Sequence, residues 1–517
     1  MLDKWFKAPV HDVLHFLGAM ILVIGLPMNK VLMSTGTIWL AANLLLKADF
    51  SEYFKKIRTS KIALIVILIL VLHFLGLIHT SDINYALHDL NSKLPFFVLP
   101  IVLVAFPIQP LFYKDLLYAF LTVVLFTSVY NIINYVSEGG AQMEDIRYMS
   151  LFGSHIRYGV IVLFAAILAV YLLLKEKRKI SKFLLLIIFL WFVFYTIYAQ
   201  VITAYFNLIV IALIVIFYQL TKITQVYFRY SLVTIFLFLI GFSSLTFIDF
   251  LRPNLSTINI DKLESHTALG NKYEHYPEHR ITENGTPIMI YISEKELEKS
   301  WNKNSSLDYY GLDHKGQVLR GTLFRYMSSL GLRKDAEGFT KLTKEDIKNI
   351  ENGIPSRKIA DSFIFDRLEG LRLQIQNYYL GQDPSGHSLL QRFEHWRAAL
   401  HIISKNPYLG VGTGDAPQEF RNAYLEINSN LHPDYHNRSH NQFLAFWVAF
   451  GIIGFILLAL LNMTIIGLGW KQQNWLYVLF GLLFFLSFLP EDTLETQQGA
   501  TFIGFFLGFL HQKVKGV

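Results

Sequence analysis

His440 and Asn441 stand directly before a long apolar run in residues 435–454, YHNRSHNQFLAFWVAFGIIG. Polar groups at the mouth of a membrane helix are costly unless they face a water-filled cavity lined by protein. A neutral imidazole can take a proton from a hydroxyl, and a neighbouring amide can donate and accept hydrogen bonds. The pair suggests a general base, His440, supported by Asn441. A histidine that caps the helix at the membrane interface is the plainer alternative.

The apolar run predicts a membrane helix that begins at His440. One face of such a helix carries His440, Leu444, Trp447, Gly451 and Gly454. The two glycines would let a second helix approach closely. The sequence therefore predicts a tightly packed helix that fixes the histidine at its outer end.

A metal site is a competing interpretation, because His432, His436 and His440 recur every four residues. Pro433 interrupts a continuous helix there, Arg438 lies among the would-be ligands, and the glutamate of the zinc-protease motif is missing. The sequence offers no evident carboxylates to orient metal-bound histidines. We expect neither a metal nor another cofactor.

Arg392 and Trp396 lie four residues apart in QRFEHWRAALHIISK and would share a helix face. An apolar stripe at 393, 396, 400 and 403 predicts that this helix lies on the outer membrane surface. The guanidinium of Arg392 can bind phosphate oxygens through two hydrogen bonds, with Trp396 beside it. Plain headgroup anchoring explains the pair equally well.

The segment GVGTGD, which follows this helix, does not have the glycine spacing of a dinucleotide-binding loop, so we interpret it as a turn.

Further charges gather where other apolar segments begin or end. His155 and Arg157 open one segment, and an arginine at a helix N-terminus opposes the helix dipole, so it needs an anionic partner. Glu491 heads the acidic loop EDTLE, which can supply that partner, orient His440 or form a solvated turn. Lys93 enters another segment from the same side, either as a counter-charge or as a snorkelling lysine.

The composition identifies the elements that must position these groups. Hydrophobic residues make up 53% of the 517 residues and charged residues 16%, which excludes an ordinary soluble domain. The formal charge of +7 resides in short connectors rather than in one stripe, so nucleic acid is not the expected partner. Cysteine is absent, which excludes disulfides, thiolate metal sites and cysteine nucleophiles.

We predict an all-α polytopic membrane protein with about twelve transmembrane helices and one large extracytoplasmic loop domain before the last three. The predicted domains are 1–250 (helices one to nine), 251–391 (soluble loop domain), 392–439 (interfacial helix and active-site loop) and 440–517 (helices ten to twelve). The predicted spans are 12–29, 31–46, 61–79, 94–110, 115–136, 156–174, 183–199, 202–219, 230–250, 440–462, 474–490 and 499–511.

The loop domain is predicted to be mixed α/β. Its TPIMIYISEKELEKSWN is typical of a strand that turns into a helix. Thr343, three residues before Asp346, predicts a capping box ahead of a short helix that stops at Gly353.

The Lys and Arg of the short connectors, such as KEKRKISK, fall on one side of the membrane if the N-terminus is cytoplasmic. Both termini are then cytoplasmic, and the polar groups described above lie outside.

Taken together, QRFEHWRAALHIISKNPYLGVGTGD, SHNQFLAFWVAFGIIG and EDTLETQQGATFIGFF resemble the O-antigen ligase and polymerase superfamily of bacterial envelope glycosyltransferases. The segment GLRKDAEGFTKLTKEDIKNIENGI resembles the loop domain of a Bacteroidetes-type branch. The resemblance implies a GT-C-like fold in the bacterial inner membrane, a periplasmic active site and a role in lipopolysaccharide biosynthesis.

The resemblance also implies a reaction. A glycan, such as an O-antigen polysaccharide, would pass from undecaprenyl diphosphate to an acceptor hydroxyl on lipid A-core or a similar molecule, without a metal or nucleotide sugar. The family's catalytic histidine falls on His440 and its diphosphate-binding arginine on Arg392. Many relatives carry another arginine between the seventh and eighth helices, where this chain reads AQVITAYFNL. Arg157 or Arg438 would replace it as a diphosphate ligand, and we favour Arg157.

Other activities remain open. A polymerase of O-antigen or exopolysaccharide, or a protein O-oligosaccharyltransferase, would use the same motifs. A polysaccharide or lipid transporter should show an internal repeat and ionisable residues near the membrane midplane, and neither is evident. The sequence therefore favours an enzyme in the lipid bilayer whose partners are a lipid-linked glycan donor and a lipid or glycan acceptor.

Overall fold

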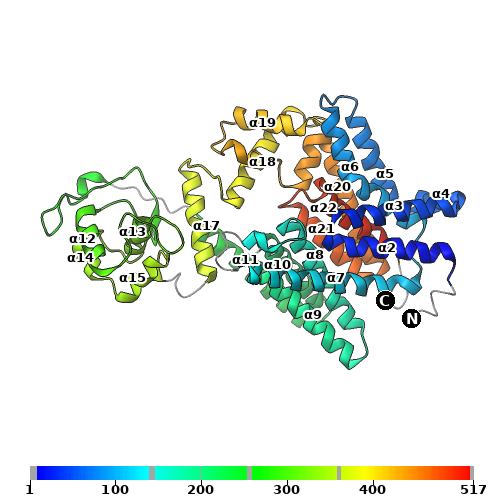
Figure 1. Ribbon diagram of the computed structural model, residues 1–517, viewed down its shortest axis with the longest axis horizontal. Helices are drawn as coiled ribbons and strands as arrows, with labels where there is room; N and C mark the ends of the chain where they lie inside the picture. Colours follow the sequence, from blue (N-terminus) through cyan, green and yellow to red (C-terminus); the bar gives the residue numbers. More distant parts are fainter. Residues whose placement is uncertain (1–7, 139–145, 200, 253–258, 358–362, 513–517) are drawn as a thin grey trace. The chain divides into compact units, whose positions relative to one another are not determined.

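The computed structural model describes residues 8–138, 146–199, 201–252, 259–357 and 363–512. These residues divide into two compact units. The first unit contains the chain up to Tyr230, Arg392–Ser429 and the chain from His436 onward, and the second contains Ser231–Gln391 and Asn430–Tyr435. Within the first unit, the N-terminal helices lie beside the C-terminal ones (Figure 1).

The first unit is a helical bundle. Its elements are α2 (Val10–Met28), α3 (Lys30–Lys47), α4 (Phe50–Thr59), α5 (Lys61–Gly76), α6 (Ile83–Ala105), α7 (Pro110–Ser137), η2 (Ile146–Met149), α8 (His155–Lys175), α9 (Lys179–Tyr198), α10 (Ile202–Thr221), most of α18 (Ser388–Lys405), α19 (Ala416–Glu426), α20 (Gln442–Gln472), α21 (Trp475–Phe488), η5 (Thr493–Glu495) and α22 (Gln497–Phe509).

The prediction of an all-α polytopic membrane protein is confirmed, but the count of about twelve spans is not. Within the described residues, eight helices are long and apolar enough to cross a bilayer, and nine if α4 and α5, bent by 91°, form one span. The predicted spans 474–490 and 499–511 correspond to helices of only 14 and 13 residues. Nearly every residue of α22 is buried by protein, so this helix does not need the length of about 20 residues that lipid exposure demands.

Two glycines set the position of α22. A Cβ at Gly504 would lie 2.6 Å from the Pro95 oxygen of α6, and one at Gly508 would lie 3.0 Å from the Pro100 Cα. The absence of side chains therefore lets α22 contact the α6 backbone. This contact brings the loop that precedes α22 beside the N-terminal half of α6.

Helix α20 is broken at Gly451, whose φ of 63° and ψ of −162° are not helical. The break leaves carbonyl groups without helical partners, and the turn after α18 supplies donors. The N–H groups of Val411 and Gly412 donate to the carbonyls of Val448 and Ala449, each at 2.9 Å. The GVGTGD segment is thus a turn, as predicted, and it caps a broken membrane helix.

The same break corrects the prediction that Gly451 admits a second helix. A Cβ at Gly451 would lie 2.0 Å from the Tyr408 oxygen, and one at Gly410 would lie 2.5 Å from the Ala449 carbonyl. The glycines therefore admit the backbone of the turn rather than another helix.

The second unit contains α11 (Val226–Leu251, mostly), η3 (Ile260–Lys262), β1 (Thr282–Glu283), β2 (Thr286–Pro287), α12 (Glu294–Asn304), α13 (Leu319–Ser329), α14 (Ala336–Thr340), α15 (Lys344–Glu351), α17 (Phe363–Tyr379) and η4 (Pro433–Tyr435). Among the described residues of this unit, the strands form one short antiparallel pair, so the predicted strand over TPIMIYI is limited to Thr286–Pro287. The chain turns at Ile288 and Met289 directly after this strand, and Tyr291 has a φ of 55°. The predicted capping box of Thr343 and Asp346 is confirmed at the start of α15.

Candidate functional site

The loop between α21 and α22 places three carboxylates inside the first unit. The side chains of Glu491, Asp492 and Glu495 are 7%, 2% and 7% exposed. A buried carboxylate is tolerated only when cations and hydrogen-bond donors compensate its charge. Four separate segments of the first unit supply these cations.

Arg392, on α18, binds the first carboxylate. Its Nε donates to the Pro490 oxygen at 2.9 Å, and its Nη2 donates to Glu491 Oε1 at 3.0 Å. These bonds tie α18 to the loop between α21 and α22. Trp396 lies one turn later, and its buried indole N–H has no hydrogen-bond partner among the described residues.

The apolar stripe predicted for α18 is divided between exposed and buried positions. Leu400, a member of the predicted apolar stripe, is 53% exposed, whereas Ile403 is buried. The buried face instead carries Glu394, His395 and Ile402. Packing against the first unit, rather than the apolar stripe alone, therefore sets the orientation of this helix.

Arg438 contacts the other two carboxylates. Its Nε lies 3.5 Å from Asp492 Oδ2, and its Nη1 lies 3.0 Å from Glu495 Oε2. Arg438 Nη1 also donates to Tyr85 Oη at 3.4 Å. Arg438 thus links the segment before α20 to α6 and to the acidic loop.

Arg157, in the first turn of α8, is less tightly held. Its Nη2 lies 4.0 Å from Asp492 Oδ1, at the limit of an ion pair. Its buried Nε has no hydrogen-bond partner in the described part of the chain. The guanidinium therefore retains donor capacity for another anion. His155 is the first residue of α8, two residues before Arg157.

Lys93 is not a snorkelling residue. Its side chain is 5% exposed, and its Nζ lies 2.7 Å from Asp89 Oδ2 and 2.9 Å from Glu495 Oε1. Gln442 also donates to Glu495 Oε1 at 3.0 Å. We call the four acids and four permanent cations the ion cluster; its members are Asp89, Glu491, Asp492, Glu495, Lys93, Arg157, Arg392 and Arg438.

His440 lies at the edge of the ion cluster with a side chain that is 31% exposed. Its Nδ1 is 3.7 Å from Glu491 Oε2 and 3.7 Å from Asp492 Oδ1. Two carboxylates facing Nδ1 favour the tautomer that carries its proton there. The lone pair then resides on Nε2, which is the arrangement that a general base requires. The buried ring of His395 lies 5.1 Å from the His440 ring.

Asn441, not His440, caps α20. The helix begins at Gln442, and Asn441 Oδ1 accepts the Leu444 N–H at 3.0 Å. Asn441 Nδ2 donates to the Leu489 oxygen at 2.9 Å. The predicted helix start at His440, and the helix face counted from it, are therefore wrong. His440 has a φ of 45° and lies immediately before the helix. The hydrogen bonds of Asn441 fix the backbone next to it.

The pKa values of the acidic loop follow from competing effects. Burial opposes ionisation of Glu491, but His440 and the neighbouring guanidiniums outweigh it and lower the pKa of this carboxyl below its usual value. Burial dominates at Asp492 and raises its pKa. At Glu495, the Lys93 and Arg438 charges overcome burial and lower the pKa. Glu491 and Glu495 are therefore the firmly ionised members of the loop.

One group of ligand atoms has the spacing of a cation site. His440, Glu491 and Asp492 each offer an atom, and these atoms lie within 4.8 Å of one another. The arginines of the ion cluster already pair with both carboxylates, so a divalent cation would compete with them. We therefore interpret the two acids as partners of His440 and the arginines. The other two histidines of the predicted four-residue spacing do not join this group: His436 stacks on a tyrosine ring, and His432 belongs to the second unit.

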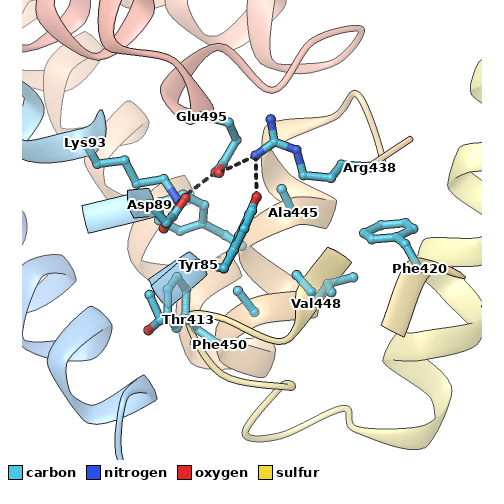
Figure 2. Close-up of a pocket in the computed structure, with 13 residues that line it drawn as sticks. Tyr85, Asp89, Lys93, Thr413, Phe420, Arg438, Ala445, Val448, Phe450 and Glu495 are labelled. Carbon is cyan, nitrogen blue, oxygen red and sulfur yellow. Dashed lines mark hydrogen bonds and ion pairs between the residues drawn. The ribbon is translucent and has the colours of Figure 1, made fainter. Parts of the chain in front are cut away.

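A pocket lies beside the ion cluster (Figure 2). Tyr85, Asp89 and Lys93 of α6 form one wall, and Arg438 and Glu495 contribute further charged groups. The remaining lining residues are Thr413, Ala416, Phe420, Ala445, Phe446, Val448, Ala449 and Phe450. His440 is not part of this lining.

The fold and the site together define a polytopic membrane protein with a buried, charge-balanced centre at one end of its helical bundle. Residues 347–459 match the family model described as O-antigen ligase. This match supports the resemblance of the chain to the O-antigen ligase superfamily. The matched segment includes Arg392, Trp396, Arg438 and His440.

One relative matches a smaller part of the chain. An uncharacterised protein of Haemophilus influenzae is 36% identical over 87 residues, which are 17% of this chain and 22% of that protein. The match thus spans about a fifth of the length of that relative.

Sequence reasoning missed several residues of the site. Asp89 lies four residues before Lys93, a spacing that signals an ion pair on a helix. Tyr85, one turn earlier on the same face, could have been found in the same way. His395 and Gln442 carry no such signal, because their partners come from other segments.

Proposed function

We propose that this protein is a membrane glycosyltransferase that moves a glycan from a polyprenyl diphosphate, such as undecaprenyl diphosphate, to an acceptor hydroxyl. The observation that carries the proposal is His440, which is partly exposed and has Nδ1 3.7 Å from two buried carboxylates. Arginines surround the same carboxylates. The O-antigen ligase match, which covers His440 and Arg392, supports the same reaction class.

Each group has a task in this reaction. Nε2 of His440 takes the proton of the acceptor hydroxyl, whose oxygen forms a bond to the anomeric carbon of the donor sugar. The bond from that carbon to the diphosphate oxygen breaks, and the electron pair leaves with the polyprenyl diphosphate. Arg392, Arg157 and Arg438 stabilise the charge that develops on the leaving group. No step requires a metal or a nucleotide sugar.

The charge balance of the ion cluster limits how the diphosphate binds. Four acids and four permanent cations already offset one another. An incoming diphosphate must therefore share guanidiniums with the carboxylates. Arg157 is the best placed to do so, because its ion pair is long and its Nε has no hydrogen-bond partner among the described residues.

The direction of the helices supports a periplasmic site in the inner membrane. Arg157 begins α8, whereas the basic connector that follows Lys175 lies at the opposite end, about 30 Å away. Likewise His440 precedes α20 and Lys471 lies in its last turn. If the basic ends are cytoplasmic, the ion cluster faces the periplasm, where lipopolysaccharide is completed.

The test measures release of undecaprenyl diphosphate from a lipid-linked glycan by purified protein in detergent, with EDTA and with rough lipopolysaccharide as acceptor. His440→Ala and Arg392→Ala should each lower the rate by about 10²-fold or more. His401→Ala is the matched control, because His401 lies on α18 but pairs with the exposed Glu426. Folding of each variant is checked by thermal unfolding.

Four outcomes would contradict the proposal in part or whole. Equal rates in the His440 variant and the wild type would remove the general base. Loss of activity in EDTA that Mg²⁺ restores would replace metal-independent transfer with a metal site at His440, Glu491 and Asp492. Transfer to a second lipid-linked glycan or to a protein, with none to rough lipopolysaccharide, would identify a polymerase or a protein glycosyltransferase. Absence of release with every acceptor would favour a transporter.

A further inference from the structure

The pocket beside the ion cluster has a composition that differs from the surroundings of His440. It is lined by two acids, Asp89 and Glu495, and by two cations, Lys93 and Arg438, which offset each other. The opposite side is apolar and partly aromatic, with Phe420 of α19 among its residues. Figure 2 shows Lys93, Glu495, Arg438 and Tyr85 pointing toward one another, joined by their ion pairs and by the hydrogen bond from Arg438 to Tyr85.

This composition does not suit a diphosphate. Lys93 is already bound to both acids, and the two carboxylates would repel phosphate oxygens. Carboxylates with oxygen lone pairs still available suit hydroxyl groups instead, because a hydrogen bond that a hydroxyl donates to a charged oxygen is strong. An aromatic wall suits the apolar face of a sugar ring. The chemistry of the pocket is therefore that of a neutral saccharide.

The pocket and His440 are connected through one residue. Arg438 lines the pocket, pairs with Asp492 and lies two residues before His440 in the chain. His440 itself does not line the pocket, and Arg392 and Arg157 contact the acidic loop at Glu491 and Asp492. Two of the proposed diphosphate ligands, Arg392 and Arg157, thus lie outside the pocket lining, and the third, Arg438, belongs to both the lining and the diphosphate ligands.

We propose that this pocket binds the acceptor saccharide and directs one of its hydroxyls toward His440. The inference rests on the proposed glycosyl transfer and adds to it the location of the second substrate. Tyr85 and Asp89 hydrogen-bond the acceptor hydroxyls, and Phe420 stacks on its ring. The donor sugar and its diphosphate bind on the side of Arg157 and Arg392.

Two variants of the full-length protein test the pocket. Tyr85→Phe removes one hydroxyl from its wall, and Ala416→Leu fills part of its volume without removing a contact. With rough lipopolysaccharide as the acceptor and a lipid-linked glycan as the donor, the KM for the acceptor should rise tenfold or more in Ala416→Leu and severalfold in Tyr85→Phe. In Ala416→Leu, the KM for the donor and the slow hydrolysis of the donor by water should stay within twofold of the wild type.

Leu425→Ala is the control, because Leu425 is exposed on the same helix as Phe420 and does not line the pocket. A higher donor KM with an unchanged acceptor KM would overturn the inference and give the pocket to the donor. Unchanged values in both variants would overturn it as well. These results leave the glycosyl transfer intact, whereas a wild type that releases no undecaprenyl diphosphate would refute the proposed function itself.

Discussion

Glu491 stands between the two groups to which we assign the chemistry. One of its oxygens binds Arg392 at 3.0 Å, and the other faces His440 Nδ1 at 3.7 Å. Because a single carboxylate contacts both, it fixes the position of the base relative to one diphosphate ligand. Its lowered pKa means that it stays ionised under assay conditions.

Glu491→Gln should therefore lower kcat by about 10²-fold while keeping the shape of the side chain. The depressed pKa gives the sign of the pH effect: the contribution of the carboxylate is complete above the ordinary glutamate pKa and is lost only as the pH falls through the lower, folded-state value. The defect should hence be the same at every pH from 6 to 9. Release of undecaprenyl diphosphate as a function of pH measures it.

Glu426→Gln is the control for that substitution, since Glu426 pairs with His401 and Lys405 at an exposed position. If kcat of Glu491→Gln equals that of the wild type at all pH values, Glu491 has no role in orienting His440. A defect confined to the KM of the donor would instead assign Glu491 to the placement of Arg392 alone.

At the scale of elements, the turn that caps the break in α20 also hydrogen-bonds to α5 and to the residues just before α6. The turn after α18 donates N–H groups to the broken helix, and Thr413 of the same turn donates its hydroxyl to the His73 oxygen of α5 at 2.7 Å. Asp415 accepts hydrogen bonds from the N–H groups of Ser81 and Asp82, just before α6. The turn thus sets the relative positions of α5, α6 and α20, and the last two carry much of the pocket.

Gly451→Ala should destabilise this junction. Its backbone conformation costs an L-residue about 1–3 kcal/mol, and the added Cβ would lie 2.0 Å from the Tyr408 oxygen. We expect a thermal midpoint lower by several degrees and a large loss of transfer activity, although no reacting group is changed. Thermal unfolding in detergent and the release assay provide the two measurements.

Gly467→Ala is the matched control, because Gly467 also lies in α20 and a Cβ added there would meet nothing within 4 Å. Helix propensity predicts that this variant is at least as stable as the wild type. Equal stability of the two alanine variants would mean that the break at Gly451 does not set the junction.

At the scale of the whole molecule, the expected orientation in the membrane can be tested on a chain that has no cysteine. Single cysteines at Lys177, between α8 and α9, and at Lys295, on α12, should lie on opposite sides of the membrane. Both positions are exposed. A maleimide that does not cross membranes should label Lys295→Cys in intact spheroplasts and Lys177→Cys only after lysis.

Labelling of both variants before lysis would contradict the orientation that the basic connectors predict. The reverse pattern would place the ion cluster on the cytoplasmic side and exclude a periplasmic transfer. A variant that retains release activity provides the check that the introduced cysteine has not changed the fold.

The sequence by itself determined the features that depend on local chemistry. Apolar length predicted a polytopic helical protein, and the charges that interrupt the apolar runs identified His440, Arg392, Arg157 and Glu491 as site candidates. The capping box at Thr343 followed from spacing within a single turn. The inferences on helices and their caps succeed because neighbours in the chain are also neighbours in a helix, whereas the roles of the site candidates stay predictions.

Only the tertiary structure decided which charges meet. Lys93 with Glu495 and Arg157 with Asp492 are pairs from distant segments, brought together because glycines let α22 contact α6 and because buried charges must be compensated. The helix start at Gln442 and the break at Gly451 depend likewise on Leu489 and on the turn near Tyr408. Side-chain partners and backbone strain are set by packing between elements, which no local pattern encodes.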